Sequence, residues 1–130
     1  MRALVLGGSG SIGSAIVDRL LEDGYEVDLQ FYSADKTQLI NRYQNRPVNL
    51  IQCDLFEDIN LENVFGHITR LDCMIYATGT ALYGMLQDMS DEQVDKSYHI
   101  HVRQLIRLSR YFVDTLRPSE NGRKIAISSI

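Results

Sequence analysis

Three regularly spaced glycines near the N-terminus are the first residues whose types could do chemistry. Gly7, Gly10 and Gly13 follow a short apolar run over residues 3–6. In such a turn the first glycine permits a sharp exit from a strand. The second lets backbone approach a diphosphate, and the third lets a helix pack closely on the sheet. A helix opening at about Ser11 offers unpaired N–H groups to an anion. The pattern predicts a dinucleotide diphosphate site, with a ligand-free strand–turn–helix as the alternative. The expected binding residues are Gly7, Ser9, Gly10, Ser11, Ile12 and Gly13.

The elements that must position this turn alternate between strand and helix. Apolar periodicity predicts strands over residues 3–6, 25–31, 48–53, 71–77 and 124–130. It predicts helices over residues 11–23, 35–44, 60–68 and 90–116, the second capped by Ser33 or Asp35 and the last by Ser90 with Gln93. This alternation indicates an α/β fold: a Rossmann-like doubly wound parallel sheet of five strands in the order 3-2-1-4-5. Residues 1–130 are expected to form one dinucleotide-binding domain.

Ligands of such a sheet bind at the carboxyl ends of the strands. The second strand is expected to end at Tyr32 and Ser33, where NAD specificity would call for a carboxylate. Neither residue is acidic, and Ser33 with Lys36 could donate to a 2′-phosphate, so the sequence favours NADP over NAD. The other expected strand ends near the ligand are Asp54 and Leu55, Ala77, Thr78 and Gly79, and Ser128 and Ser129.

Composition excludes several other classes of protein. A net charge of −4 and a pI near 5.3 argue against a general nucleic-acid binder. The sequence holds no apolar run of membrane-spanning length, so no membrane partner is expected. Cys53 and Cys73 are too few for a disulfide framework or a zinc cluster, which favours buried thiols in a cytoplasmic protein.

The expected long helix carries two histidines and a row of arginines. His99 and His101 are two residues apart and share no helix face, so no metal site is expected. His101 falls within a predicted apolar stripe, and one interpretation makes it a hydrogen-bonded core histidine. Arg103, Arg107 and Arg110 are expected to be solvated or to contact another subunit. The apolar stripe itself is predicted at Val94, Tyr98, Val102, Leu105, Phe112 and Leu116.

Taken together, these motifs resemble the N-terminal half of a short-chain dehydrogenase/reductase, most closely the 3-oxoacyl-carrier-protein reductase type. The resemblance covers all 130 residues. Gly7, Gly10 and Gly13 match the family's glycine turn, although Leu6 and Ser11 stand where threonine and glycine are usual. The family's Asn-Asn-Ala-Gly segment appears as residues 76–79, in which only the glycine is kept.

The resemblance also implies roles for individual residues. Asp54 and Leu55 match the pair that contacts the adenine ring, and Ser129 matches the active-site serine. His101 stands where many members have an asparagine of the catalytic tetrad, which is the second interpretation of that residue. The family's reaction is hydride transfer between a nicotinamide and a carbonyl such as a 3-oxoacyl thioester. In the family, the long helix packs against another subunit, so the resemblance implies a homo-oligomer.

Family members continue for about as many residues again, and their Tyr-x-x-x-Lys segment should follow the serine by about a dozen residues. The chain is therefore expected to be truncated after the fifth strand, to lack that segment, and to be inactive on a small carbonyl substrate by itself. Two functions remain open at this point. One is an NAD(P)-dependent oxidoreductase, and the other is a catalytically silent dinucleotide-binding or regulatory module.

Overall fold

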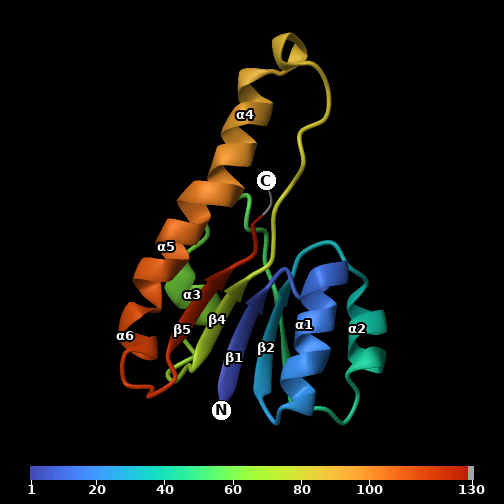
Figure 1. The fold of residues 1–130 in the computed structure, drawn as a ribbon. Coiled ribbons are helices and arrows are strands. Elements are labelled where there is room, and N and C mark those ends of the chain that lie inside the picture. The colour runs from blue at the N-terminus through green and yellow to red at the C-terminus, as the bar shows by residue number, and fades with distance from the viewer. Residues whose placement is uncertain (129–130) are drawn as a thin grey trace.

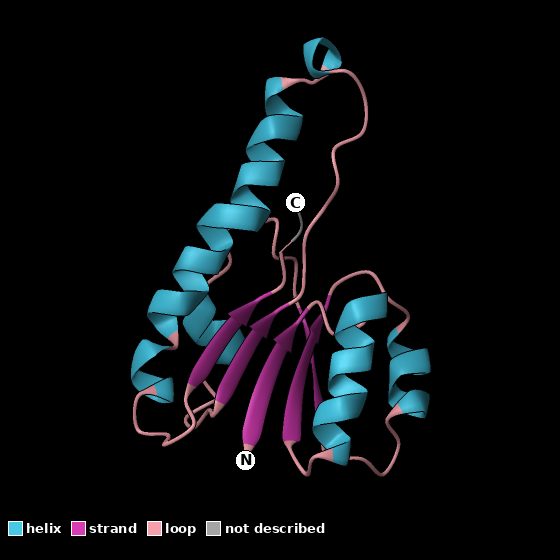
Figure 2. Ribbon diagram, in the orientation of Figure 1, coloured by secondary structure: helices cyan, strands magenta, loops and turns pink. Residues whose placement is uncertain are grey.

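A computed structural model describes residues 1–128 and shows a single parallel sheet (Figures 1 and 2). Its order is β3-β2-β1-β4-β5, and every neighbouring pair is parallel. The predicted α/β class and the predicted strand order are therefore confirmed. The strands are β1 (Arg2–Leu6), β2 (Glu26–Phe31), β3 (Val48–Gln52), β4 (Cys73–Tyr76) and β5 (Arg123–Ala126).

Helices cover both faces of the sheet, as Figure 1 shows. Helices α1 (Ser11–Glu22) and α2 (Lys36–Arg42) lie on one face. The opposite face carries α3 (Leu61–Phe65), α5 (Gln104–Tyr111) and α6 (Val113–Leu116). Between α4 (Asp91–Tyr98) and α5 the chain forms a π-helical turn, His99–Arg103, and a short 3₁₀ turn, Leu86–Asp88, precedes α4.

Strand β1 is buried completely, because successive side chains enter the two different cores. Ala3 and Val5 pack under α1 and α2, whereas Leu4 and Leu6 pack under α3 and α5. A strand buried on both faces needs the continuous apolar run that the sequence shows after Arg2.

Strand β2 is polar at alternate positions and is nevertheless buried. Asp28 is fully buried and accepts hydrogen bonds from Arg2, Nε at 2.6 Å and Nη2 at 2.9 Å, and from Asn49 Nδ2 at 3.2 Å. The same hydrogen bond to Asp28 raises the pKa of the Arg2 guanidinium. Asp28 therefore belongs to an ion pair in the interior, and its polarity does not mark a solvent-facing side.

The expected helix caps are present. Asp35 caps α2 by accepting from the backbone N–H groups of Thr37 and Gln38, which decides between the two predicted caps. At α4, Ser90 and Gln93 form the predicted capping box, each side chain bonding the other's backbone N–H.

The long helix buries Phe112 and Leu116 as predicted, with Leu105 partly buried, but its first half differs from the predicted apolar stripe. Its inward residues recur at every fourth position: Ile100, Gln104, Leu108, Phe112 and Leu116. Val94, Tyr98 and Val102, predicted to be core, are exposed. Two features explain the difference. Helix α4 extends beyond the carboxyl edge of the sheet (Figure 1), so its first turns have no core to enter. The π-helical turn then inserts an extra residue and rotates the rest of the helix.

Candidate functional site

The glycine turn is built from positions that leave no room for side chains. Gly7 has φ +77°, a conformation that favours glycine, and a Cβ on it would lie 2.8 Å from the carbonyl oxygen of Ala77. A Cβ on Gly13 would lie 2.0 Å from the carbonyl oxygen of Gly7. The expected crowding at Gly13 is confirmed, and the atoms that crowd it belong to the turn itself. Gly10 differs, because a Cβ there would meet nothing closer than 3.5 Å.

Helix α1 begins directly behind this turn, with Gly10 as its N-cap. The first turn of α1 carries no acidic side chain, and no side chain caps it. The N–H groups of Ser11, Ile12 and Gly13 therefore stand at the positive end of a 12-residue helix, where an anion is favoured. The side chain of Ile12 is exposed and lies beside the turn.

Gln30 is a site residue that sequence reasoning missed. It is buried in β2, and its Oε1 accepts from the backbone N–H of Gly7 at 2.9 Å. Its Nε2 donates to the carbonyl oxygen of Cys53 at 2.8 Å, so one side chain ties the glycine turn to the end of β3. A polar residue in a strand predicted to be interior was the available signal. Burial also raises the pKa of the Cys53 thiol to about 11.

A cleft of about 260 Å³ opens at the carboxyl edge of the sheet in front of the glycine turn. The structure brings most of the predicted binding residues to its walls: Gly7, Ser9, Gly10, Tyr32, Ser33, Asp54, Leu55, Ala77, Thr78 and Gly79. It adds four that were not predicted: Gln30, Phe31, Phe56 and Ile100. Ser11, Ile12 and Gly13 are not among the lining residues and could contribute through the start of α1.

A second hollow of about 830 Å³ continues from the cleft, since Ala77, Thr78 and Gly79 line both. His101 lines this hollow, together with Ile12 from α1 and with residues 126–128 at the end of β5. The two hollows together form one trough along the carboxyl edge. A trough of this kind could hold an elongated ligand.

His101 is exposed, so the core interpretation of this histidine is wrong. Its Nε2 lies 2.7 Å from the carbonyl oxygen and 3.2 Å from the backbone nitrogen of Thr80. The imidazole also limits the space beside Gly79, where a Cβ would lie 2.5 Å from the His101 ring. The histidine therefore holds the chain that leaves β4. Ser129, the other predicted catalytic residue, lies outside the described residues.

The end of β2 shows no free carboxylate. Tyr32 and Ser33 are both exposed at the cleft. The nearest acid along the chain is Asp35, whose Oδ1 already accepts from the backbone N–H groups of Thr37 and Gln38. This wall of the cleft is therefore uncharged at Tyr32 and Ser33.

The expectation that the sequence lacks a Tyr-x-x-x-Lys spacing is wrong, because this spacing occurs once, from Tyr32 to Lys36. Tyr32 follows β2, which is separated from β5 by β1 and β4. At about 4.8 Å between neighbouring strands, Tyr32 lies roughly 14 Å across the sheet from the chain that leaves β5. This pair therefore cannot serve the serine in the family's manner.

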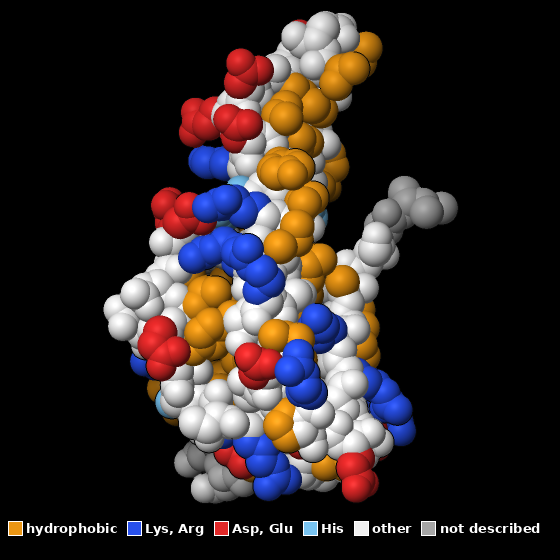
Figure 3. Space-filling view, turned by 90° about the vertical axis from the view of Figure 1, so that its left-hand side faces the viewer, with side chains coloured by type: hydrophobic (Ala, Val, Ile, Leu, Met, Phe, Trp, Pro, Cys, Tyr) orange, Lys and Arg blue, Asp and Glu red, His pale blue; other side chains and the backbone are white. Residues whose placement is uncertain are grey.

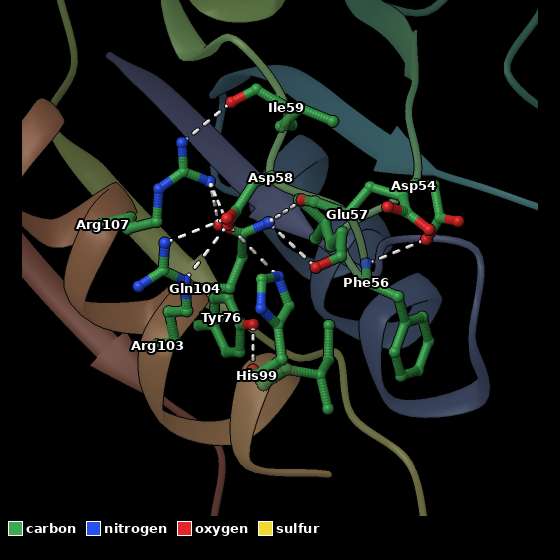
Figure 4. A network of polar contacts seen from close by, with 12 residues as sticks. Asp54, Phe56, Glu57, Asp58, Ile59, Tyr76, His99, Arg103, Gln104 and Arg107 are labelled. Carbon is green, nitrogen blue, oxygen red and sulfur yellow. Dashed lines mark hydrogen bonds and ion pairs between the residues drawn. The ribbon is translucent and has the colours of Figure 1, made fainter. Parts of the chain in front are cut away.

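Polar contacts also fix the loop that follows β3, residues 54–59, as Figure 4 shows. Asp54 Oδ1 accepts from the backbone N–H of Phe56 at 2.9 Å, and Leu55 is buried. Two of the arginines in the predicted row hold this loop, and one of them, Arg103, is also exposed as expected. Arg103 pairs with Asp58, and Arg107 Nη2 donates to the carbonyl oxygen of Ile59 at 2.9 Å.

The described residues also bear on metal binding and on membrane insertion. Among residues 1–128, no group of three or more His, Cys, Asp or Glu side chains is arranged to hold a metal ion. Within the same residues, no helix combines the length and the apolar character needed to cross a bilayer.

Known proteins resemble this chain over nearly its whole length. The family profile described as short chain dehydrogenase matches residues 1–130. The 3-oxoacyl-[acyl-carrier-protein] reductase FabG of Rickettsia conorii is 27% identical over 128 residues, which cover 98% of this chain and 53% of the relative. The hydroxynaphthalene reductase arp2 of Aspergillus fumigatus is 30% identical over 136 residues, covering 98% of this chain and 49% of the relative. The chain thus spans about half the length of these curated relatives.

Solved structures agree with this assignment. A short chain dehydrogenase from Burkholderia cenocepacia in complex with NADP superposes with a TM-score of 0.85 at 28% identity, covering 98% of this chain and 55% of that one. A blue fluorescent protein from a metagenomic library, in complex with NADPH, gives a TM-score of 0.81 at 26% identity, with 98% and 55% coverage. The glycine turn, the strand order and the match of a family profile to the whole chain lead to one conclusion: the chain belongs to the short-chain dehydrogenase family.

Proposed function

We propose that residues 1–130 form a dinucleotide-binding domain that holds a nicotinamide dinucleotide in the trough at the carboxyl edge of the sheet. The single observation that carries this proposal is the glycine turn: Gly7 and Gly13 have no room for a Cβ, and Gly10, the N-cap of α1, lines the cleft without a side chain. A diphosphate needs backbone N–H donors at a helix N-terminus and no side chain in its way. The turn meets both requirements.

The remaining walls suit the other parts of the ligand. Asp54 and Leu55 follow β3 at the cleft, where an adenine ring would contact the apolar side chain and the carboxylate. Ala77, Thr78 and Gly79 lie between the cleft and the second hollow, and would bind the nicotinamide half. A bound reduced nicotinamide supplies the hydride.

NADP is the favoured form of the cofactor. Tyr32 and Ser33, which follow β2 at the cleft, carry no carboxylate that would hold a ribose 2′-hydroxyl or repel a 2′-phosphate. Ser33 and Lys36 are exposed and could donate to that phosphate. Two similar structures were solved with NADP or NADPH bound.

The proposed reaction is reversible hydride transfer to a carbonyl such as a 3-oxoacyl thioester. Ser129 would hold the substrate oxygen, and His101 would take the place of the tetrad asparagine beside the second hollow. Within residues 1–130 no Tyr-x-x-x-Lys segment follows Ser129. A polypeptide of these residues alone is therefore expected to lack general acid help worth about 10²–10⁴-fold, and to bind cofactor without rapid turnover.

One observation favours the second candidate, a dinucleotide-binding module without catalysis. His101 Nε2 already bonds the backbone of Thr80, so one ring nitrogen of this predicted catalytic residue has a structural partner. An absorbance assay with NADPH and acetoacetyl thioester is informative in one direction for the 130-residue chain. Rapid turnover would exclude the second candidate and contradict the expectation of inactivity, whereas cofactor binding without turnover fits both candidates.

Calorimetric titration with NADPH and NADH tests the proposed site. We expect saturable binding, with NADPH preferred. Ser33→Asp places a carboxylate at the end of β2. It should weaken NADPH binding by about tenfold, or about 1.4 kcal/mol, while NADH binding is retained or improved. Asn41→Asp, on the exposed surface of α2, is the matched control for added charge and should leave both affinities unchanged. Failure of both cofactors to bind would overturn the proposal.

A further inference from the structure

The adenine side of the cleft depends on a loop with little support of its own. Residues 54–59 contain no helix or strand, and residues 54–56 line the cleft. Within the loop, the backbone bonds are short-range: Glu57 N–H to Asp54 and Ile59 N–H to Glu57. Local turns of this kind shape a loop without fixing its position relative to the sheet.

Leu55, Phe56 and Ile59 of the loop pack in or against the core. The buried hydrogen bonds that hold the loop come from one side chain, Gln104, at the start of α5. Its Nε2 donates to the carbonyl oxygens of Leu55 and Glu57, both at 2.9 Å. Its Oε1 accepts from Arg107 Nη1 at 2.8 Å, and that contact sets which way the amide faces. Gln104 is fully buried, so every polar atom of its amide needs a protein partner and each has one.

Arg107 and Arg103 complete the contact between the helix and the loop (Figure 4). Arg107 Nη2 donates to the carbonyl oxygen of Ile59, and Arg103 bonds Asp58 from Nε at 3.2 Å and Nη2 at 2.9 Å. The last residue of the π-helical turn and the start of α5 therefore hold successive parts of the loop, from Leu55 through Ile59.

The helix is in turn fixed to the sheet. The Tyr76 hydroxyl, at the end of β4, donates to the carbonyl oxygen of Ile100 within the π-helical turn. Ile100 is buried and lines the cleft. A continuous set of contacts thus runs from β4 through the π-helical turn and Gln104 to the loop.

We propose that Gln104 is a positioning residue for cofactor binding: through its two donated bonds and its partner Arg107 it holds the loop of residues 54–59 in the conformation that receives the adenosine half of the dinucleotide. This inference rests on the proposed function. Gln104 is not among the residues that line the cleft, so its effect reaches the ligand through Leu55 and Glu57.

The expected loss of affinity depends on the fraction of molecules in which the loop keeps its binding conformation. Without the amide, the buried carbonyl of Leu55 and that of Glu57 lose their donor. If the loop then holds its binding conformation in about a tenth of the molecules, the apparent Kd of the dinucleotide rises about tenfold.

The test compares Gln104→Glu with the parent chain by calorimetric titration of NADPH and of adenosine 2′,5′-bisphosphate. The variant keeps the size of the side chain but turns an oxygen toward two carbonyls. We expect the affinity for both ligands to fall by the same factor, about tenfold. Gln104→Met, which lacks all three bonds, is the second variant and should weaken both ligands likewise if Gln104→Glu does not fold.

Leu108→Val is the matched control, one helical turn along α5 and fully buried, with an apolar side chain that makes none of the hydrogen bonds to the loop. It should lower the melting temperature without changing either affinity. Hydrogen exchange at Phe56 and Glu57 in the ligand-free chain gives a separate readout: faster exchange is expected in the Gln104 variants and not in Leu108→Val.

The outcomes separate the two proposals. If the parent chain binds neither ligand, the proposed function fails, and the exchange comparison still decides whether Gln104 holds the loop. Unchanged exchange in the Gln104 variants, or affinities equal to those of the parent, overturns the positioning role. Equal losses in Leu108→Val would also overturn it, because they would reflect general destabilisation.

Discussion

Gly10 and Gly13 lie in the same turn but are needed for different reasons, Gly10 for binding and Gly13 for packing. Substitution of each by alanine can distinguish the two roles. A Cβ on Gly13 would overlap the carbonyl oxygen of Gly7, whereas a Cβ on Gly10 meets nothing nearer than 3.5 Å. Gly13→Ala should therefore destabilise the fold by about 1–3 kcal/mol and weaken dinucleotide binding with it. Gly10→Ala should change stability by less than about 0.5 kcal/mol and still lose affinity, because its methyl group enters the diphosphate position. Urea unfolding and calorimetry on both variants measure the two effects.

The two variants serve as controls for each other. If Gly10→Ala binds NADPH as well as the parent chain, the diphosphate does not lie against that glycine. If Gly13→Ala is as stable as the parent, the turn relaxes more easily than the 2.0 Å approach implies.

Single residues also show how far the sequence could predict the site. The glycines were predictable because their types and spacing have one common structural cause. Gln30 and Gln104 were not, since a polar residue in an alternating strand or on a helix reads as solvent-facing by default. Both are buried, and both are satisfied by backbone groups far away in sequence, at Gly7, Cys53, Leu55 and Glu57. Partners of this kind are known only once the chain is folded.

At the scale of elements, strand order and caps were predictable, and the orientation of the long helix was not. Alternating periodicities and right-handed crossovers restrict the sheet to few arrangements. The helix from Ser90 onward carries apolar residues on more than one face, and only tertiary contact decides which face is buried. The π-helical turn at His99–Arg103 then changes the helical phase, which no periodic template anticipates.

The contact between β4 and the π-helical turn can be tested directly. Tyr76→Phe removes the hydroxyl that donates to the carbonyl oxygen of Ile100 and leaves that buried acceptor without its donor. We expect a loss of about 1–3 kcal/mol in the free energy of unfolding. Tyr98→Phe, on an exposed position of α4, should cost less than about 0.5 kcal/mol. Equal urea midpoints for the two variants would contradict the role given to Tyr76.

A second element-level contact predicts pH dependence. Asp72, just before β4, accepts from the Ser119 hydroxyl at 2.6 Å and from the backbone N–H of Arg2 at 2.7 Å, and these bonds lower its pKa. Because the folded-state pKa lies below the unfolded value of about 3.9, the stabilisation is present above that value and is lost as pH falls through the folded pKa. Asp72→Asn should therefore be less stable at pH 7 and should lose less stability on acidification. Parallel pH profiles of the two melting temperatures would contradict this assignment.

At the scale of the whole molecule, the exposed apolar residues gather on one elongated region. Figure 3 shows hydrophobic side chains following the long helix and its tip. Tyr83, Leu86 and Tyr98 are 89%, 83% and 62% exposed. Isolated apolar side chains are common on protein surfaces, but a row of them along one element is typical of an interface.

The sheet adds a second candidate contact surface. Among residues 1–128, β5 pairs only with β4, so its other edge presents unpaired backbone groups, and Ile125 and Ile127 are about 40% exposed. We expect the purified 130-residue chain to self-associate through this edge, through the long helix, or through both. Light scattering on three chains distinguishes these routes: the parent, Ile125→Lys at the edge, and Tyr98→Lys on α4. The variant that restores a monomer identifies the surface, because a lysine is tolerated on an exposed face and opposes its burial in an interface. A monomeric parent chain at high micromolar concentration, with a cooperative thermal transition, would show that neither surface drives association and that this domain is stable by itself.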